Sequence, residues 1–319
     1  MSGLGMNELA LEIAEHLIEQ APRFRVASHS LANGARVVDC GSNIAGGYDA
    51  GLALAEICMG GLGTVALASL EIGDDIWPGV IVSTDHPMIS CMASQYAGWA
   101  INVDGFFAMG SGPLRAHARV EKELFNELGY EEEADHGVLV LETRQLPTEA
   151  VAAWIASRAR LSPEQLTLLL APTASLAGTV QISARIVETA MHKMEQLGFD
   201  LAKVVSGFGT APLPPVARND LKAIGRTNDC ILYGGTVYFT VNAGDAELAP
   251  LAEQLPASAS RDYGTPFYDI FERYERDFYR IDPLLFSPAE VHLTSAETGN
   301  TFHGGSLNPG VLRASCYPA

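Results

Sequence analysis

Residues 178–207 read GTVQISARIVETAMHKMEQLGFDLAKVVSG, and this stretch carries the signals that decide the fold class. Apolar side chains recur at helical spacing from Val180 to Met194, which predicts a helix. Gly198 is a typical helix end, and the apolar run that follows it predicts a strand over residues 201–206. A loop, a helix, a glycine and a strand in this order are typical of an α/β protein.

An earlier segment, residues 46–69, repeats this order of loop, helix, glycine and strand. Two duplicated halves with a cleft between them would explain the repetition, although chance recurrence in an α/β chain is the simpler explanation. The length of 319 residues suits two domains. We expect an α/β (α+β) fold with two mixed helix–sheet domains, residues 1–147 and 148–319, between which segments can be exchanged.

Local signals add three further elements. Asn33-Gly34 stands between two alternating apolar runs, which predicts a β-hairpin. His86-Pro87 predicts the start of a helix that reaches Ala97. An aromatic-rich run predicts another helix over residues 265–279.

The composition excludes several classes of protein. Lys and Arg number 20 against 38 Asp and Glu, so the net charge is 20 − 38 = −18, which disfavours nucleic-acid binding. With 48% hydrophobic residues the chain can form a large core, but no apolar run reaches the length of a membrane span. The first 20 residues lack Lys and Arg, and the five cysteines are widely spaced. We therefore expect a cytoplasmic protein with reduced thiols and no membrane partner.

Motifs for metals, phosphates and covalent nucleophiles are missing from the sequence. The glycine-rich segments match neither a P-loop nor a dinucleotide fingerprint, and the eight histidines form no H-E-x-x-H motif. His292 and His303 can converge only through tertiary structure, so we expect no metal. A cysteine nucleophile has little support, because Cys58, Cys91 and Cys230 sit in apolar surroundings.

The most informative pair of charged residues lies in the helix predicted at residues 179–192. Arg185 and Glu188 are three residues apart and therefore share one face of that helix. A guanidinium close to a carboxylate lowers the pKa of the carboxylate and keeps it ionised, which suits a general base. A solvated surface ion pair is the simpler alternative.

A second polar segment, Gly225-Arg226-Thr227-Asn228-Asp229, precedes a strand pattern from Cys230 to Val241. Its position at a strand entrance predicts a loop, and the side chains of Arg226, Thr227, Asn228 and Asp229 are candidates for ligand contacts. A turn held by hydrogen bonds from Asn228 and Asp229 is the simpler alternative.

Several segments, taken in order, point to one family. They are AEICMGGL at 55–62, SQYAGW at 94–99, AMGSGP at 108–113, GTVQ at 178–181, GRTND at 225–229 and LFSPA at 285–289. This ordered set covers roughly residues 7–310 and resembles the methenyltetrahydromethanopterin cyclohydrolases of one-carbon metabolism.

The resemblance implies a reaction and a site. Water adds to the methenyl carbon that bridges N5 and N10 of a reduced pterin, and ring opening gives the N5-formyl compound, reversibly and without a separate cofactor. Tetrahydromethanopterin is itself the substrate carrier and lies in a cleft between two α/β domains. An arginine and a glutamate on one helix carry the acid–base chemistry in this family, and they match Arg185 and Glu188. The family also forms homo-oligomers, trimers among them.

The same resemblance implies pterin contacts from Gln95 and from Gly110, Ser111 and Gly112. In archaeal members a lysine follows this glutamine, whereas this chain has Tyr96, which favours a pterin with a shorter and less acidic tail. A catalytically inactive pterin-binding protein and an unrelated cysteine- or metal-dependent hydrolase remain the alternatives.

Overall fold

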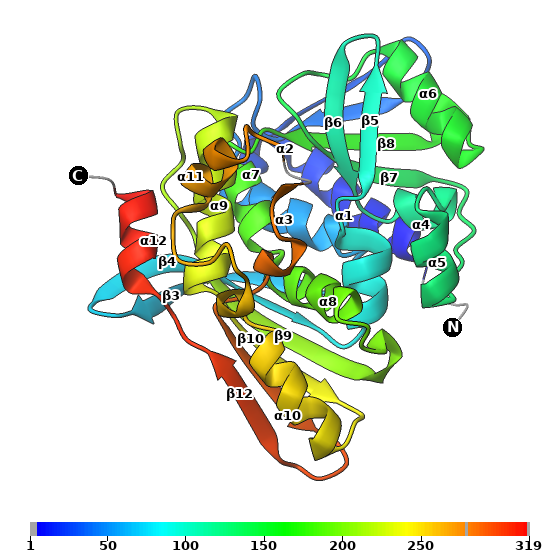
Figure 1. Cartoon of the computed structure of the whole chain (residues 1–319). Helices are drawn as coiled ribbons and strands as arrows, with labels where there is room; N and C mark the ends of the chain where they lie inside the picture. Colours follow the sequence, from blue (N-terminus) through cyan, green and yellow to red (C-terminus); the bar gives the residue numbers. More distant parts are fainter. Residues whose placement is uncertain (1–4, 278–279, 318–319) are drawn as a thin grey trace. The chain divides into compact units, whose positions relative to one another are not determined.

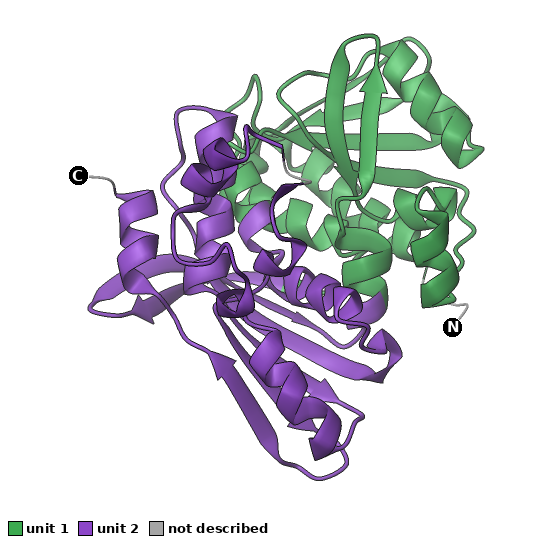
Figure 2. Ribbon diagram, viewed as in Figure 1, with its two compact units in different colours: residues 1–64, 89–181 green, residues 65–88, 182–319 purple. Residues whose placement is uncertain are grey.

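Two six-stranded sheets organise the chain, and the computed structural model describes it at residues 5–277 and 280–317 (Figure 1). Each sheet is the centre of one compact unit (Figure 2). Unit 1 contains Met1–Thr64 and Ile89–Gln181, and unit 2 contains Val65–Met88 and Ile182–Ala319. The α/β class and the two-part organisation predicted from the sequence are confirmed.

The two compact units do not coincide with the division predicted at residue 147. Strands β7 (Gly137–Glu142) and β8 (Leu166–Ala171) lie on either side of that position and pair in parallel within unit 1. A domain boundary at residue 147 would place these two paired strands in different domains. The chain instead passes between the units near residues 64, 88 and 181.

The sheet of unit 1 has the strand order β1-β2-β8-β7-β6-β5, with parallel pairing among β2, β8 and β7. Its remaining strands are β1 (Ala27–Ser30), β2 (Arg36–Asp39), β5 (Trp99–Val103) and β6 (Phe106–Ser111). Its helices are α1 (Met6–Glu19), α2 (Ala21–Phe24), α3 (Tyr48–Cys58), η1 (Met88–Gln95), α4 (Leu114–Ala118), α5 (Lys122–Leu128), α6 (Glu149–Ala159) and η2 (Pro163–Gln165). Helix α7 (Leu176–Ser183) begins in unit 1 and ends in unit 2.

The central strand β8 explains why helices cover both faces of this sheet. All six of its residues are buried, as expected of a parallel strand with helices on each side. Leu169 packs in a core cluster with residues of α1 and α3, while Leu168 and Leu170 pack in another with residues of α6. The hairpin predicted around Asn33-Gly34 is confirmed, since β1 and β2 pair antiparallel on either side of it.

The sheet of unit 2 has the strand order β12-β11-β10-β9-β4-β3. Its strands are β3 (Thr64–Ile72), β4 (Asp75–Thr84), β9 (Val204–Pro212), β10 (Thr236–Val241), β11 (Glu290–Ser295) and β12 (Thr301–Gly305). Its helices are α8 (Ile186–Gln196), η3 (Leu201–Lys203), α9 (Asp220–Gly234), α10 (Asp245–Gln254), η4 (Ala257–Ala259), α11 (Phe267–Arg273), η6 (Pro283–Leu285) and α12 (Pro309–Cys316). No helix of the described residues has the length and apolar character needed to cross a membrane.

Helix α8 packs against β9 through two glycines of the strand. A Cβ atom added at Gly207 would lie 2.7 Å from Cγ1 of Val187, and one added at Gly209 would lie 2.9 Å from Cγ2 of Ile186. Any larger residue would therefore push the helix away from the sheet. The glycines set the position of the first turn of α8.

Helix α9 is the main departure from the sequence prediction. The strand expected from Cys230 is wrong over residues 230–234, because α9 continues to Gly234 and β10 begins only at Thr236. The Asn219 side chain accepts a hydrogen bond from the Lys222 N–H and caps the start of the helix.

The repeated segments fold differently. Helix α8 and strand β9, from residues 178–207, pack together in unit 2, whereas α3 lies in unit 1 and most of β3 in unit 2. The likeness at residues 46–69 is therefore one of local order rather than of a duplicated domain. Of the helix predicted at 265–279, α11 covers Phe267–Arg273, and residues 278–279 lie outside the described residues.

Candidate functional site

A break between two helices positions Arg185 and Glu188. The sequence predicts one helix over residues 179–192, but α7 ends at Ser183 and α8 begins at Ile186. Arg185 takes the N-cap position, where its carbonyl oxygen accepts hydrogen bonds of 2.8 Å from both the backbone N–H and the hydroxyl of Thr189. Glu188 consequently lies in the first turn of α8, where the helix dipole stabilises a carboxylate.

The two charged side chains are close together and buried. Nη1 of Arg185 lies 4.0 Å from Oε2 of Glu188, and the side chains are only 10% and 8% exposed. The alternative of a solvated surface pair is therefore wrong. Because burial makes an unpaired charge costly, each of the two groups compensates the charge of the other at this depth.

A second group of predicted residues converges in unit 1, at the end of η1. This π-helix occupies much of the helix predicted from His86 to Ala97. The Ser111 hydroxyl donates a 2.6 Å hydrogen bond to the carbonyl of Gln95, and the Gly112 N–H donates one of 2.8 Å to the carbonyl of Ser94. Gly112 has φ of +113°, a conformation that favours glycine. The structure thus brings Gln95, Ser111 and Gly112 together, with Gly110 adjacent on β6.

The segment from Arg226 to Asp229 is helical rather than a loop, and it lies within α9. Nη1 of Arg226 donates to the carbonyl of Pro215 at 3.1 Å, and Nδ2 of Asn228 donates to the carbonyl of Ile224 at 2.8 Å. The predicted loop at a strand entrance is wrong, because the helix continues through these positions.

Thr227 and Asp229 are fully buried in the same helix. The Thr227 hydroxyl donates to the carbonyl of Ala223, while Asp229 accepts from the Phe267 N–H at 2.8 Å and from the Ser315 hydroxyl at 2.5 Å. Burial raises the pKa of Asp229 to about 7. The two bonds of Asp229 connect α9 to α11 and α12. A role for the four residues in pterin binding stays a prediction.

Comparison with known proteins identifies the family. A model described as Cyclohydrolase (MCH) matches residues 5–316. The chain belongs to this cyclohydrolase family. Relatives named methenyltetrahydromethanopterin cyclohydrolase are 48% identical over 316 residues in Methylobacterium organophilum (97% of each chain) and 43% identical over 313 residues in Methanococcoides burtonii (98% of each chain). A relative of the same name from Methylobacillus flagellatus is 47% identical over 311 residues, 97% of this chain and 94% of its own.

One buried residue of this cyclohydrolase was missed by sequence reasoning. Arg115 is fully buried, and Nη1 donates to the carbonyls of Met92 and Ser94 at 3.3 and 3.1 Å. Its Nε and Nη2 donate to Oε1 of Glu121 at 3.0 and 2.8 Å. Arg115 therefore fixes the end of η1, where Gln95 lies. A single arginine in a short helix carries no sequence signal of such a role.

A second missed residue of the cyclohydrolase is Ser183, at the end of α7. It is fully buried, and its hydroxyl has no hydrogen-bond partner within the described residues. Buried hydroxyls are normally paired, so this group beside the Arg185 turn is an exception. A serine inside a helical pattern does not indicate that its hydroxyl will be buried without a partner.

Proposed function

We propose that the chain is a methenyltetrahydromethanopterin cyclohydrolase, which converts the N5,N10-methenyl form of the pterin plus water reversibly to the N5-formyl form. The observation that carries the proposal is family membership over nearly the whole chain, residues 5–316. The buried Arg185–Glu188 pair supports the same conclusion, because acid–base groups are what this hydration requires.

The chemistry of the substrate assigns a role to Glu188. The methenyl bridge is an amidinium cation and is already electrophilic, so the enzyme has to deprotonate water and then protonate a leaving nitrogen. Glu188 takes a proton from the attacking water, and the oxygen bonds to the methenyl carbon. The bond from that carbon to N10 then breaks, Glu188 returns the proton to N10, and the hydroxyl proton of the adduct leaves to solvent. The reaction thus converts a cation and water into a neutral formyl compound and one proton.

Arg185 positions and tunes Glu188. Its guanidinium favours the ionised carboxylate, which is the form that accepts a proton from water. The negative carboxylate also stabilises the cationic methenyl carbon by charge. In unit 1, Gln95 with Gly110, Ser111 and Gly112 are proposed to line the pterin. On α9, Arg226 and Asn228 are the better candidates for contacts because they are only half-buried.

Tyr96 supports a pterin with a shorter and less acidic tail. Its ring centre lies 5.2 Å from the guanidinium carbon of Arg115. A lysine at this position would place a second cation close to Arg115, whereas the tyrosine ring attracts it. Affinities measured for methenyl pterins with long acidic tails and with short tails test this proposal, and equal affinities would contradict it.

The direct test of the proposed function is a spectrophotometric assay of methenyl-tetrahydromethanopterin beside methenyl-tetrahydrofolate. We expect the chain to accelerate loss of the methenyl absorbance of the first compound, with activity that survives a chelator and thiol alkylation. Binding without turnover would indicate a pterin-binding protein. Loss of activity with the chelator or the alkylating reagent would indicate a metal- or cysteine-dependent hydrolase.

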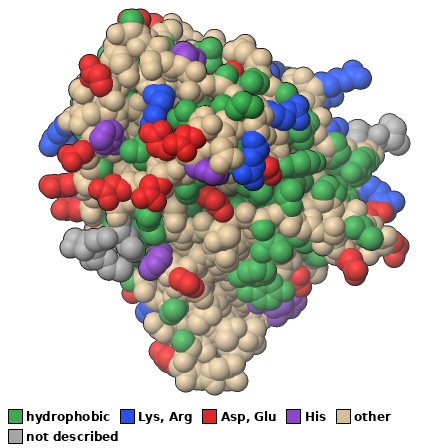
Figure 3. All heavy atoms as spheres, turned by 180° about the vertical axis from the view of Figure 1, so that it is seen from behind, with side chains coloured by type: hydrophobic (Ala, Val, Ile, Leu, Met, Phe, Trp, Pro, Cys, Tyr) green, Lys and Arg blue, Asp and Glu red, His purple; other side chains and the backbone are tan. Residues whose placement is uncertain are grey.

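Two further properties belong to this proposal. We expect a homo-oligomer, trimers among the options, because the β3–β4 edge exposes Leu67 and Ile76, the latter 75% exposed. Hydrophobic side chains also gather on part of the face shown in Figure 3. Light scattering of the wild type and of Ile76→Glu tests the assembly.

All five cysteines are buried free thiols, which supports a cytoplasmic location.

A further inference from the structure

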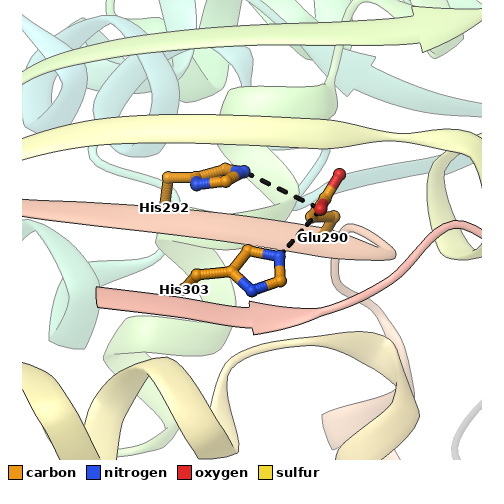
Figure 4. A group of neighbouring side chains, drawn as sticks. All are labelled: Glu290, His292 and His303. Atoms are coloured by element: carbon orange, nitrogen blue, oxygen red, sulfur yellow. Dashed lines mark hydrogen bonds and ion pairs between the residues drawn. The ribbon is translucent and has the colours of Figure 1, made fainter. Parts of the chain in front are cut away.

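Two neighbouring strands of unit 2 bring two histidines and a glutamate together (Figure 4). Glu290 and His292 are two residues apart on β11, so their side chains share one face of the sheet. His303 on the edge strand β12 lies directly opposite His292 in the antiparallel register. Directly opposed side chains on one face are close neighbours, and this register places all three groups side by side.

The distances suit a single small cation. Nε2 of His303 lies 2.7 Å and Nε2 of His292 lies 3.9 Å from Oε1 of Glu290, and one ligand atom from each residue falls within 4.8 Å of the other two. Ligand atoms on a tetrahedral Zn²⁺, with bonds of 2.0–2.2 Å, are about 3.3 Å apart. Small side-chain rotations would bring these atoms to that separation.

Neighbouring groups hold Glu290 and His292 in place. The Thr236 hydroxyl donates to Oε2 of Glu290 at 3.3 Å, which leaves Oε1 directed at the histidines. The ring of Tyr238 stacks on the ring of His292, with centres 4.4 Å apart and planes 8° apart. Metal sites are commonly supported by such outer contacts, which fix the orientation of the ligands.

The site is open to solvent and separate from the catalytic pair. The side chains of Glu290, His292 and His303 are 24%, 23% and 49% exposed, so an ion can reach them. Tyr238 and Phe239 are neighbours on β10, so their side chains lie on opposite faces of the sheet. The ring of Phe239 would lie 3.0 Å from a Cβ atom added at Gly207, where α8 packs, so Phe239 is on the face that α8 covers. The histidines therefore project from the face away from α8 and from Glu188.

We propose that Glu290, His292 and His303 form a binding site for a divalent transition-metal ion, with Zn²⁺ as the best fit. Two imidazoles and one carboxylate are a common donor set for such ions and leave a coordination position open. The ion would join β11 to the edge strand β12 and restrain that edge. It takes no part in the hydration reaction proposed above.

Calorimetric titration of the tag-free full chain with ZnCl₂ tests the site. We expect about one Zn²⁺ per chain, and binding weakened at least about tenfold in His303→Gln and in Glu290→Gln. Glu290→Gln keeps the shape of the side chain and removes only the charge. His29→Gln, at an exposed histidine of β1, is the matched control and should bind as the wild type does. A wild type that binds no Zn²⁺, or equal binding by the His303→Gln and His29→Gln variants, would overturn the proposal.

Co²⁺ provides a second measurement that does not depend on stability. Tetrahedral Co²⁺ with nitrogen and oxygen ligands has strong visible d–d absorption, which we expect in the wild type and in His29→Gln but not in His303→Gln. Zn²⁺ should also raise the melting temperature of the wild type by mass action and leave that of His303→Gln unchanged. Identical Co²⁺ spectra in the two variants would contradict the assignment.

Discussion

Arg185 occupies the N-cap position of the helix whose first turn holds Glu188, and Nη1 of the arginine lies 4.0 Å from Oε2 of the glutamate inside the protein. This relationship depends on the break between α7 and α8. An uninterrupted helix would keep the two residues on one face but would remove Glu188 from the N-terminal turn, where the helix dipole favours its charge. The local break thus supplies part of the electrostatic environment of the proposed base.

Arg185→Gln should move the pH dependence of the reaction. Without the guanidinium the positive charge that favours the ionised carboxylate is lost, so the acid limb of kcat/KM should move to higher pH. Pre-steady-state or steady-state assays across pH measure the shift. Arg158→Gln, at an exposed position of α6, is the control. Superimposable profiles for wild type and Arg185→Gln would refute the tuning role.

Gly209→Ala should destabilise unit 2 by about 1–3 kcal/mol, because the new Cβ would lie 2.9 Å from Cγ2 of Ile186. The same change at Gly310, exposed on α12 with its nearest neighbour at 3.6 Å, should be neutral or stabilising by up to about 1 kcal/mol. Urea unfolding of both variants measures the contrast. Equal effects would show that α8 does not depend on close packing against β9.

Asp229→Asn should remove a pH dependence of stability. The folded protein holds the proton on Asp229 up to about pH 7, whereas an ordinary aspartate loses it near 3.8. The stability contribution is therefore fully present below the lower value, falls between the two values by at most about 1.4 kcal/mol per pH unit, and levels off above about pH 7. Asparagine does not ionise; its Oδ1 can accept from the Phe267 N–H, and its Nδ2 can donate to the Ser315 hydroxyl. Urea unfolding at pH 5 and pH 8 should show a flatter profile in the variant, and parallel profiles would contradict the assignment.

Arg115→Met should destabilise unit 1 by about 3–5 kcal/mol, because it leaves Glu121 and the carbonyls at the end of η1 without their buried partner. Arg119→Met removes a more exposed ion pair with Glu131 and should cost less than about 1 kcal/mol. The free energies of unfolding compare the two. A small loss in Arg115→Met would show that the carbonyls find other partners.

Local patterns predicted the elements that have their own turn or capping chemistry. Asn33-Gly34 identified the hairpin, and the i, i+3 spacing identified Arg185 and Glu188 as neighbours. The sequence did not reveal the helix break, because Ser183 and Ala184 include neither proline nor glycine. It therefore placed Glu188 on a solvated face rather than in a buried first turn.

The error in α9 and the meeting of the two histidines both depend on tertiary structure. Cys230 to Gly234 form a short apolar run, and a buried helix of that length cannot be told from a buried strand by periodicity. His292 and His303 meet only because β12 pairs with β11 in one register, which depends on tertiary structure. Packing between distant segments decided both outcomes.

The most direct test of the central claim is the turnover of methenyl-tetrahydromethanopterin by Glu188→Gln, followed as loss of the methenyl absorbance. The account predicts a fall in kcat of about 10²–10⁴-fold with an unchanged fold, because the amide has the same shape and cannot exchange the proton. Glu195→Gln, at a partly exposed position of the same helix, should retain wild-type activity. A Glu188→Gln enzyme as active as the wild type would contradict the account.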